Sequence, residues 1–176
     1  FYPSSSATEI DRYVIYNTQE QIWYYGNLER HAWLDSGVEN FPQATNNNYV
    51  YQHEIGYNDD GSAMTNVYVE SSDFDIGEGN QFSSISSIIP DIRFLQDDNS
   101  GTVNIVTKMR NYPGESLTTK ATSEISSSTT KANVRARGRQ AVVRFESNDD
   151  QSGSGNVSLG WRVGATRFDV KTDGRR

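Results

Sequence analysis

Residues 134–145 read VRARGRQAVVRF, and this stretch decides the interpretation of the sequence around it. Its first half alternates arginine with small or apolar residues, which is the period of a strand with one face packed inward and the other exposed. In its second half the apolar residues shift to the opposite parity, at Ala141, Val143 and Phe145. We therefore expect one strand here, with a one-residue bulge at residues 138–140 that re-aims the side chains.

Alternation of the same kind occurs on both sides of this stretch. Downstream it is found at residues 159–163 and 168–171, and upstream at residues 67–70 and 73–76, after which a turn leads into a further strand expected at 81–89. Short alternating runs separated by turn residues are typical of antiparallel strands. We expect residues 65–176 to form an antiparallel β-sandwich. The expected core of this sandwich includes Ile88, Ile105, Val143, Phe145 and Trp161.

Two connections in this region can be predicted from turn and loop composition. The residues DDNSG at 97–101 stand between apolar runs at 92–95 and 103–106, which predicts a hairpin of these two runs. Residues 116–130 are rich in Ser and Thr and show little apolar pattern, so we expect a long loop there. No window of the chain keeps the apolar stripe of an amphipathic helix, and the sequence predicts an all-β fold.

The first part of the chain has its own set of aromatic β runs. Runs at 13–17 and 21–26 flank a polar turn and predict a hairpin. Further runs at 31–34 and 49–54 follow, separated by a loop expected at 35–48. Four short antiparallel strands of this spacing form a propeller blade or the edge of a sandwich. We expect a propeller-blade-like unit at residues 1–64, with Trp23 and Trp33 packed between blades. The turn-rich stretch from residue 57 to residue 64 marks its expected end.

Charge is distributed unevenly along the 176 residues. The net charge is −7, but residues 1–130 carry six Lys or Arg and 18 Asp or Glu, which gives −12, while residues 131–176 carry ten and five, which gives +5. This separation is suited to joining like copies or to meeting an acidic neighbour, and it disfavours DNA binding by the whole chain. The alternative is that the basic residues only solvate an outer sheet face. The candidate assembly interface consists of Arg135, Arg137, Arg139, Arg162, Arg167, Arg175 and Arg176.

Three acidic clusters have oxygen donors of the kind that Ca²⁺ prefers, at residues 58–60, at 73–75 together with Glu78, and at 97–99. None of them has the full spacing of an EF-hand loop, and turns or solvated faces explain them more simply. His31 and His53 are far apart, and the chain has no Cys, so no zinc ligand set can be assembled. The sequence therefore predicts no metal and no cofactor.

Catalytic patterns are also missing from the sequence. It contains no nucleophile elbow, and no spacing favours a carboxylate pair or a Ser–His pair, so we expect no enzyme activity. Exposed Tyr and Trp side chains stack on sugars, which makes a carbohydrate- or receptor-binding β domain the main alternative to an assembly protein. The sequence shows no apolar run long enough to cross a membrane and no secretory leader, and we expect no membrane insertion by this fragment.

A series of short motifs, each weak by itself, occurs along nearly the whole chain. They are YVIYN at 13–17 with IWY at 22–24, AWLDSG at 32–37, SSDFDIG at 71–77, IPD at 89–91, VRARGR at 134–139, GWRVGATR at 160–167 and DGRR at 173–176. In order and spacing they resemble the carboxy-terminal part of tail nozzle proteins of short-tailed bacteriophages, also called tail tubular or packaged-DNA stabilisation proteins. The opening at Phe1, instead of Met, fits a part of a longer protein.

This resemblance implies a structural role in the virion. The family builds a ring, usually of six copies, below the portal and the tail adaptor, with a β-propeller and a β-sandwich platform around the channel through which DNA is ejected. It implies no catalytic residue and no sequence-specific contact with the DNA. The long Ser/Thr stretch before Arg135 and the missing start depart from the family pattern, and both affect the platform and the tip of the channel.

Overall fold

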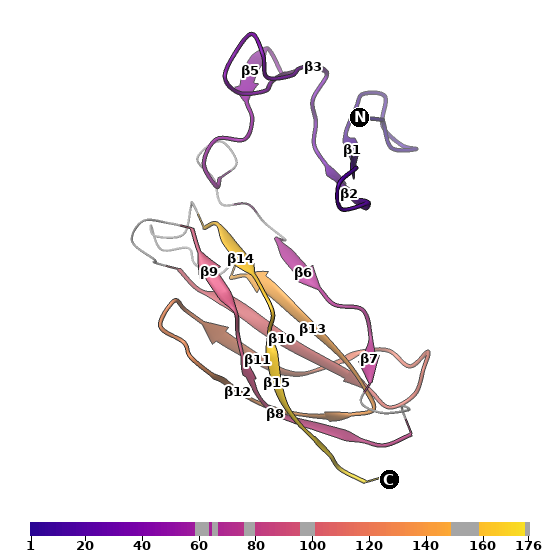
Figure 1. The fold of residues 1–176 in the computed structure, drawn as a ribbon. Coiled ribbons are helices and arrows are strands. Elements are labelled where there is room, and N and C mark those ends of the chain that lie inside the picture. Colours follow the sequence, from indigo (N-terminus) through magenta and orange to yellow (C-terminus); the bar gives the residue numbers. More distant parts are fainter. Residues whose placement is uncertain (59–63, 65–66, 76–79, 96–100, 149–158, 175–176) are drawn as a thin grey trace. The chain divides into compact units, whose positions relative to one another are not determined.

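A computed structural model of the chain describes residues 1–58, 64, 67–75, 80–95, 101–148 and 159–174 (Figure 1). Within these ranges it contains fifteen strands, β1 to β15, arranged in antiparallel sheets, and no helix. The all-β prediction is confirmed. The described residues accordingly include no helix of the length and apolarity needed to cross a membrane.

The chain divides into two compact units, Phe1–Gly56 and Tyr57–Arg176. The division falls where the turn-rich stretch at residues 57–64 begins. Each unit has its own sheets, and each is described by itself below.

The first unit contains two small sheets. β1 (Arg12–Asn17) pairs with β2 (Ile22–Asn27) in the predicted hairpin, and β3 (Ala32–Leu34), β4 (Gln43–Asn46) and β5 (Tyr49–Gln52) form a three-stranded sheet. β4 lies where we expected only a loop, and that expectation is wrong. Its sequence, QATN, has a single apolar residue, so no alternation is visible, although its central position in the sheet buries both Ala44 and Asn46.

The second unit is built from two larger sheets and a short ladder. The first sheet has the order β11 (Thr118–Ile125), β10 (Val103–Arg110), β13 (Gln140–Ser147) and β6 (Tyr68–Glu70), and β7 (Phe74–Asp75) also pairs with β13. The second sheet has the order β12 (Ala132–Gly138), β8 (Ser83–Ile89) and β15 (Arg167–Thr172). The ladder pairs β9 (Ile92–Phe94) with β14 (Trp161–Val163).

The central stretch, residues 134–145, is a corner between these two sheets and not one bulged strand. β12 ends at Gly138, Arg139 follows, and β13 begins at Gln140 in the other sheet. At this corner the Arg139 N–H donates to the carbonyl of Arg110 at 3.0 Å. A Cβ at Gly138 would lie 2.7 Å from the Cβ of Met109, so only glycine fits this close approach. The change of parity in the sequence marks the change of sheet, because each half keeps its own apolar side on the core.

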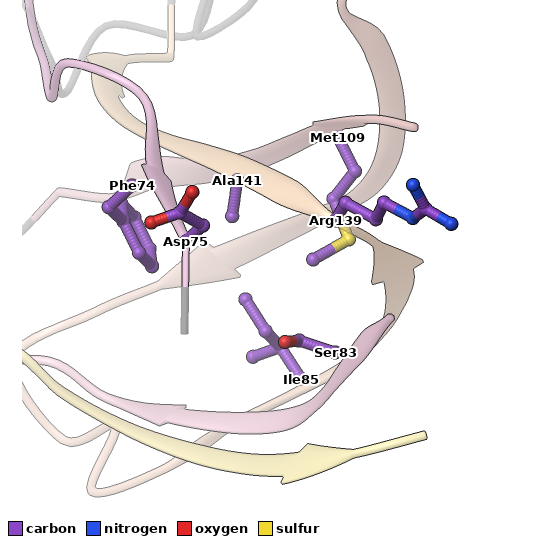
Figure 2. A pocket seen from close by; sticks show the side chains of 7 residues that line it. All are labelled: Phe74, Asp75, Ser83, Ile85, Met109, Arg139 and Ala141. Carbon is purple, nitrogen blue, oxygen red and sulfur yellow. The ribbon is translucent and has the colours of Figure 1, made fainter. Parts of the chain in front are cut away.

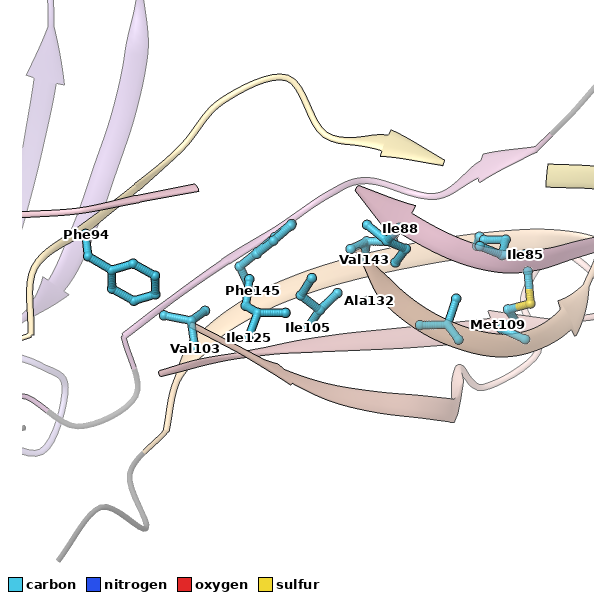
Figure 3. Packing of buried hydrophobic residues seen from close by; sticks show 13 residues of the cluster. Ile85, Ile88, Phe94, Val103, Ile105, Met109, Ile125, Ala132, Val143 and Phe145 are labelled. Atoms are coloured by element: carbon cyan, nitrogen blue, oxygen red, sulfur yellow. The ribbon is translucent and has the colours of Figure 1, made fainter. Parts of the chain in front are cut away.

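Strands of both sheets contribute to one hydrophobic core (Figure 3). Ile88, Ile105, Val143 and Phe145 are buried as predicted. Trp161 is partly buried against the same cluster, and its indole N–H donates to the Ser147 hydroxyl at 2.9 Å. The pairing of the two apolar faces gives the second unit its stability, since burying each large aliphatic side chain contributes about 1.5–3 kcal/mol.

Two predicted connections differ in the structure. The Ser/Thr-rich stretch contains β11, a strand at the edge of its sheet, where one face meets solvent and threonine replaces the usual apolar residues. The expected hairpin of residues 92–95 with 103–106 does not form. β9 pairs with β14 and β10 pairs with β11 and β13, so the two runs belong to different sheets, and the turn residues 96–100 lie outside the described ranges.

Candidate interaction surfaces

The second sheet of the second unit presents a basic outer face. In β12 the buried residues alternate with exposed Asn133, Arg135 and Arg137, which place their side chains on the side away from the core. Across the sheet, Arg137 is in register with Ser84 of β8, and Ser84 is in register with Lys171 of β15. We use the term basic face for Arg135, Arg137, Arg167 and Lys171, which flank the short serine side chains of β8. One acid, Asp169, is exposed on the same face between Arg167 and Lys171, and its carboxylate accepts from the Ser86 hydroxyl at 2.6 Å.

The residues of the basic face differ in how they are held. Arg137 contacts its own chain: its Nε lies 2.5 Å from a carboxylate oxygen of Asp173, and its guanidinium lies 4.2 Å from the centre of the Phe82 ring. Arg135, Arg167 and Lys171 are exposed, and none of the three forms an ion pair with a described residue. These three residues are therefore the members of the basic face most available to a partner, and two of them are arginines.

Arg139 belongs to the corner and not to the basic face. Its guanidinium lies 4.9 Å from the Phe82 ring centre and 5.3 Å from that of Tyr112. Its stem lines a small hollow at the end of the core, and Figure 2 shows its guanidinium directed away from the other lining side chains. The hollow has no room for a water molecule, so it is a packing gap and not a ligand pocket.

Of the other predicted interface residues, Arg162 lies exposed on β14, and Arg175 and Arg176 lie outside the described residues. The sequence analysis missed Arg93, which is exposed on β9 directly opposite Arg162. The alternation Ile92-Arg93-Phe94 was the available signal, but the pairing of β9 with β14 could not be read from it.

The outer side of the first sheet is charge-balanced, in contrast to the basic face. Lys108 pairs with Glu70 at 2.6 Å, and the Nε of Arg144 lies 2.6 Å from a carboxylate oxygen of Glu146. The Arg144 guanidinium also lies 3.6 Å from the ring centre of Tyr68. Lys108 and Arg144 each have an acidic neighbour in the same chain, so the centre of this side offers little unmatched charge to a partner.

The first unit exposes most of its large apolar side chains. In the β1–β2 hairpin, Val14 opposes Tyr25 and Tyr16 opposes Trp23 on one face, while Ile15 and its partner occupy the other. Trp23 is 64% exposed and Tyr25 is 82% exposed. Its buried apolar residues are only Pro42 and Ala44, all of residues 1–56 being described. A two-stranded hairpin that is apolar on both faces requires cover on both faces, since such hairpins are at best marginally stable in water.

The first unit is also acidic. Residues 1–56 contain seven Asp or Glu and two Arg, which gives a net charge of −5. One of these acids, Asp11, fastens the start of the chain: its carboxylate accepts from the Ser4 hydroxyl at 2.7 Å and from the Ser4 N–H at 2.6 Å. The hydroxyl hydrogen bond is the main cause that lowers the pKa of Asp11 below its usual value. The other acids leave an excess of negative charge on this unit.

The candidate metal ligands lie partly within the described ranges. Asp73 forms an ion pair with Arg110, which accounts for one carboxylate of its cluster, and Glu78 and residues 59–60 and 97–99 lie outside the described ranges. His53 accepts a hydrogen bond from the Nε of Arg30 at 3.0 Å and lies against Trp33. Within the described parts of the chain, no three His, Cys, Asp or Glu side chains are grouped as metal ligands would be.

Trp23 and Trp33, which we expected to pack between blades, each contact other rings. Trp23 lies 4.5 Å from the ring of Tyr16, and Trp33 lies 5.3 Å from that of Phe1.

Comparison of the sequence with known proteins gives no match to a family model and no match to a curated protein.

Proposed function

We propose that this chain is a structural protein of a bacteriophage tail, part of the ring-shaped nozzle through which DNA is retained and ejected. One observation carries the proposal that it assembles: the first unit leaves apolar side chains uncovered on both faces of its hairpin. Exposed apolar surface of this extent marks a protein–protein contact. The nozzle identity rests on the resemblance of the motifs along the chain.

The finer architecture belongs to the same proposal. The strands of residues 1–64 are part of a propeller-blade-like arrangement completed by strands from elsewhere. The two sheets of residues 65–176, which share one core, form the sandwich of the platform. Both assignments are supported by the antiparallel pairing and by the core residues that the two sheets contribute together.

Charge indicates how copies would be joined. The basic face of one copy, with Arg135 and Arg167 exposed, meets the acidic first unit of the next copy, whose net charge is −5. Repeated head-to-side contacts of this kind close into a ring if the rotation between copies permits, and we propose a homo-oligomer of six in contact with the tail adaptor and other tail proteins. A net charge of −7 suits a channel through which DNA slides without being retained.

The proposed function is purely structural. The protein acts in the virion without catalysis, metal or cofactor, makes no sequence-specific contact with the DNA, and this part of it does not insert into a membrane.

A second function, a carbohydrate- or receptor-binding domain of a tail appendage, is favoured by the exposed rings of Trp23, Tyr25 and Tyr49. Aromatic faces of this kind stack on sugar rings. The two functions differ in what covers the rings: a second protein in the first case, a glycan in the second.

The test is the oligomeric mass of the purified chain, measured by light scattering over a range of concentrations, with negative-stain images of the same samples. We expect ring-shaped oligomers. A variant with Tyr25→Lys and Tyr49→Lys should remain monomeric, and Tyr112→Lys, an exposed tyrosine of the other unit, is the matched control and should still assemble. A chain that stays monomeric at high concentration and binds glycans through the same rings would overturn the assembly function in favour of the second.

A further inference from the structure

The ladder of β9 with β14 brings two arginines face to face. Arg93 and Arg162 are directly opposed in the antiparallel register, and both are exposed (Figure 1 shows the two strands side by side). The residues on either side of them in both strands turn the other way, toward the hydrophobic core. These are Ile92, Phe94, Trp161 and Val163. The two guanidinium groups therefore extend from the same outer side of the ladder.

Backbone hydrogen bonds fix the spacing of this pair. The Leu95 N–H donates to the carbonyl of Gly160 at 2.9 Å, and the Gly164 N–H donates to the carbonyl of Asp91 at 2.7 Å. Hydrogen-bonded and non-hydrogen-bonded pairs alternate along an antiparallel ladder, which makes the arginine pair, midway between these two, a hydrogen-bonded one. Its Cα atoms are then about 5.5 Å apart, the wider of the two spacings. Two flexible side chains on this spacing can hold one small anion between their guanidinium groups.

Glycines flank Arg162 on the same side of its strand. A Cβ atom at Gly160 would clash with the ring of Tyr57, and a Cβ atom at Gly164 would clash with the carboxylate of Asp91. Asp91 stands two positions before Arg93, so its carboxylate lies on the same side of the ladder as the pair. The Asp91 carboxylate accepts a hydrogen bond from the backbone N–H of Ala165 at 2.9 Å.

Like charges directly opposed on a sheet destabilise it. Neither Arg93 nor Arg162 forms an ion pair with a described residue, and the Asp91 carboxylate accepts a hydrogen bond from the backbone N–H of Ala165. The geometry points to an oxyanion-binding site at this ladder, in which one phosphate, sulfate or carboxylate group is held between the two planar guanidinium forks. Arginine suits this role because its fork matches the oxygen atoms of such groups in pairs.

Thermal unfolding of the full chain tests the site. Sodium sulfate is the probe, compared with sodium chloride at equal ionic strength. We expect about 50 mM sulfate to raise the Tm by about 2 to 5 °C more than chloride does, as a ligand of millimolar affinity would. Arg93→Gln and Arg162→Gln should each remove this increment. Sulfate also stabilises proteins without binding to a site, so the increment counts only as the difference from Arg135→Gln, an exposed arginine of the same unit that should retain it.

The variants have a second readout that a merely structural role would not give. At about 1 µM protein in chloride of low concentration, removing either arginine relieves the repulsion, and the Tm should rise by about 1 to 3 °C. A fall in Tm would show that the pair is already neutralised by carboxylates of the chain, and it would refute the site. Equal sulfate increments in the parent chain, in Arg162→Gln and in Arg135→Gln would show non-specific stabilisation and refute it as well.

The oxyanion has two possible sources, a free anion or a carboxylate of a second copy, and the experiment separates them. A free anion gives the sulfate-dependent increment in Tm already at about 1 µM protein, and this increment does not change with protein concentration. A carboxylate of a second copy gives a Tm that rises with protein concentration in chloride, and this dependence on concentration is absent in Arg162→Gln. Either result supports the site, and the first does so even if the proposed ring assembly fails. Absence of both responses overturns it.

Discussion

Reversing the charge of Arg135 and Arg167 together should weaken association while sparing the fold. Both side chains are exposed, and within the described residues neither has an ionic partner, so their replacement by glutamate should change the free energy of unfolding by no more than about 0.5 kcal/mol each. An exposed ion pair with a neighbouring copy contributes about 0.2–1 kcal/mol. Reversal replaces that attraction by a repulsion of similar size, which gives about 1–4 kcal/mol for the two sites together.

This loss corresponds to a Kd of each contact between copies that is roughly 5- to 700-fold higher, at about 1.4 kcal/mol per tenfold change. Sedimentation velocity of the Arg135→Glu, Arg167→Glu variant over a concentration series measures it, with circular dichroism as the check on folding. Lys120→Glu, an exposed reversal on β11 of the other sheet, is the matched control. A folded variant whose sedimentation equals that of the parent chain would refute the interface and assign these arginines to a solvated face.

Arg137 and Arg139 are poor choices for the same test. Each stacks on Phe82, and Arg137 is also bound to Asp173, so their reversal would disturb contacts within the chain as well as any interface. A loss of assembly in such a variant would have two explanations. The test is therefore made on Arg135 and Arg167, the two arginines of the basic face that form no ion pair with a described residue.

Three further predictions concern stability. Ile105→Ala should lower the free energy of unfolding by about 2–5 kcal/mol, because the side chain is fully buried between the sheets, and urea unfolding measures this. Gly138→Ala should cost about 1–3 kcal/mol in the same assay, since the new Cβ would lie 2.7 Å from that of Met109; an unchanged midpoint would contradict the tight corner. The folded-state pKa of Asp11 is lowered, so its contribution is present above the unfolded pKa of about 3.9 and is lost as pH falls through the folded value. Asp11→Asn should therefore flatten the acid end of the stability profile, and a profile equal to that of the parent would contradict the Ser4 contact.

The sequence indicated the all-β class, the β1–β2 hairpin and the core residues, because each of these leaves a local trace: a period of two, a polar turn, or an apolar side. It did not indicate which strands pair. β9 and β10 follow each other in the chain but lie in different sheets, and no local pattern distinguishes that from a hairpin. Polar strands such as β4 and β11 escape detection because their position in the sheet, and not their composition, determines their burial.

The candidate site shows the same division. The alternation in residues 134–139 was sufficient to place Arg135 and Arg137 on an outer face, and this is where they lie. The intramolecular partners of Arg137, and the pairing of Arg162 with Arg93, depend on residues distant in the chain that only the tertiary structure brings together.

The central claim is that other protein covers the apolar side chains of the first unit in the functional state. Oxidative footprinting of Trp23 and Tyr25 tests it most directly, with mass spectrometry of the full chain at concentrations below and above assembly. We predict that both side chains react readily in the dilute chain, where they are 64% and 82% exposed, and become strongly protected in the oligomer, while exposed Tyr112 reacts equally in both. Equal reactivity of Trp23 and Tyr25 in the two states would contradict the claim.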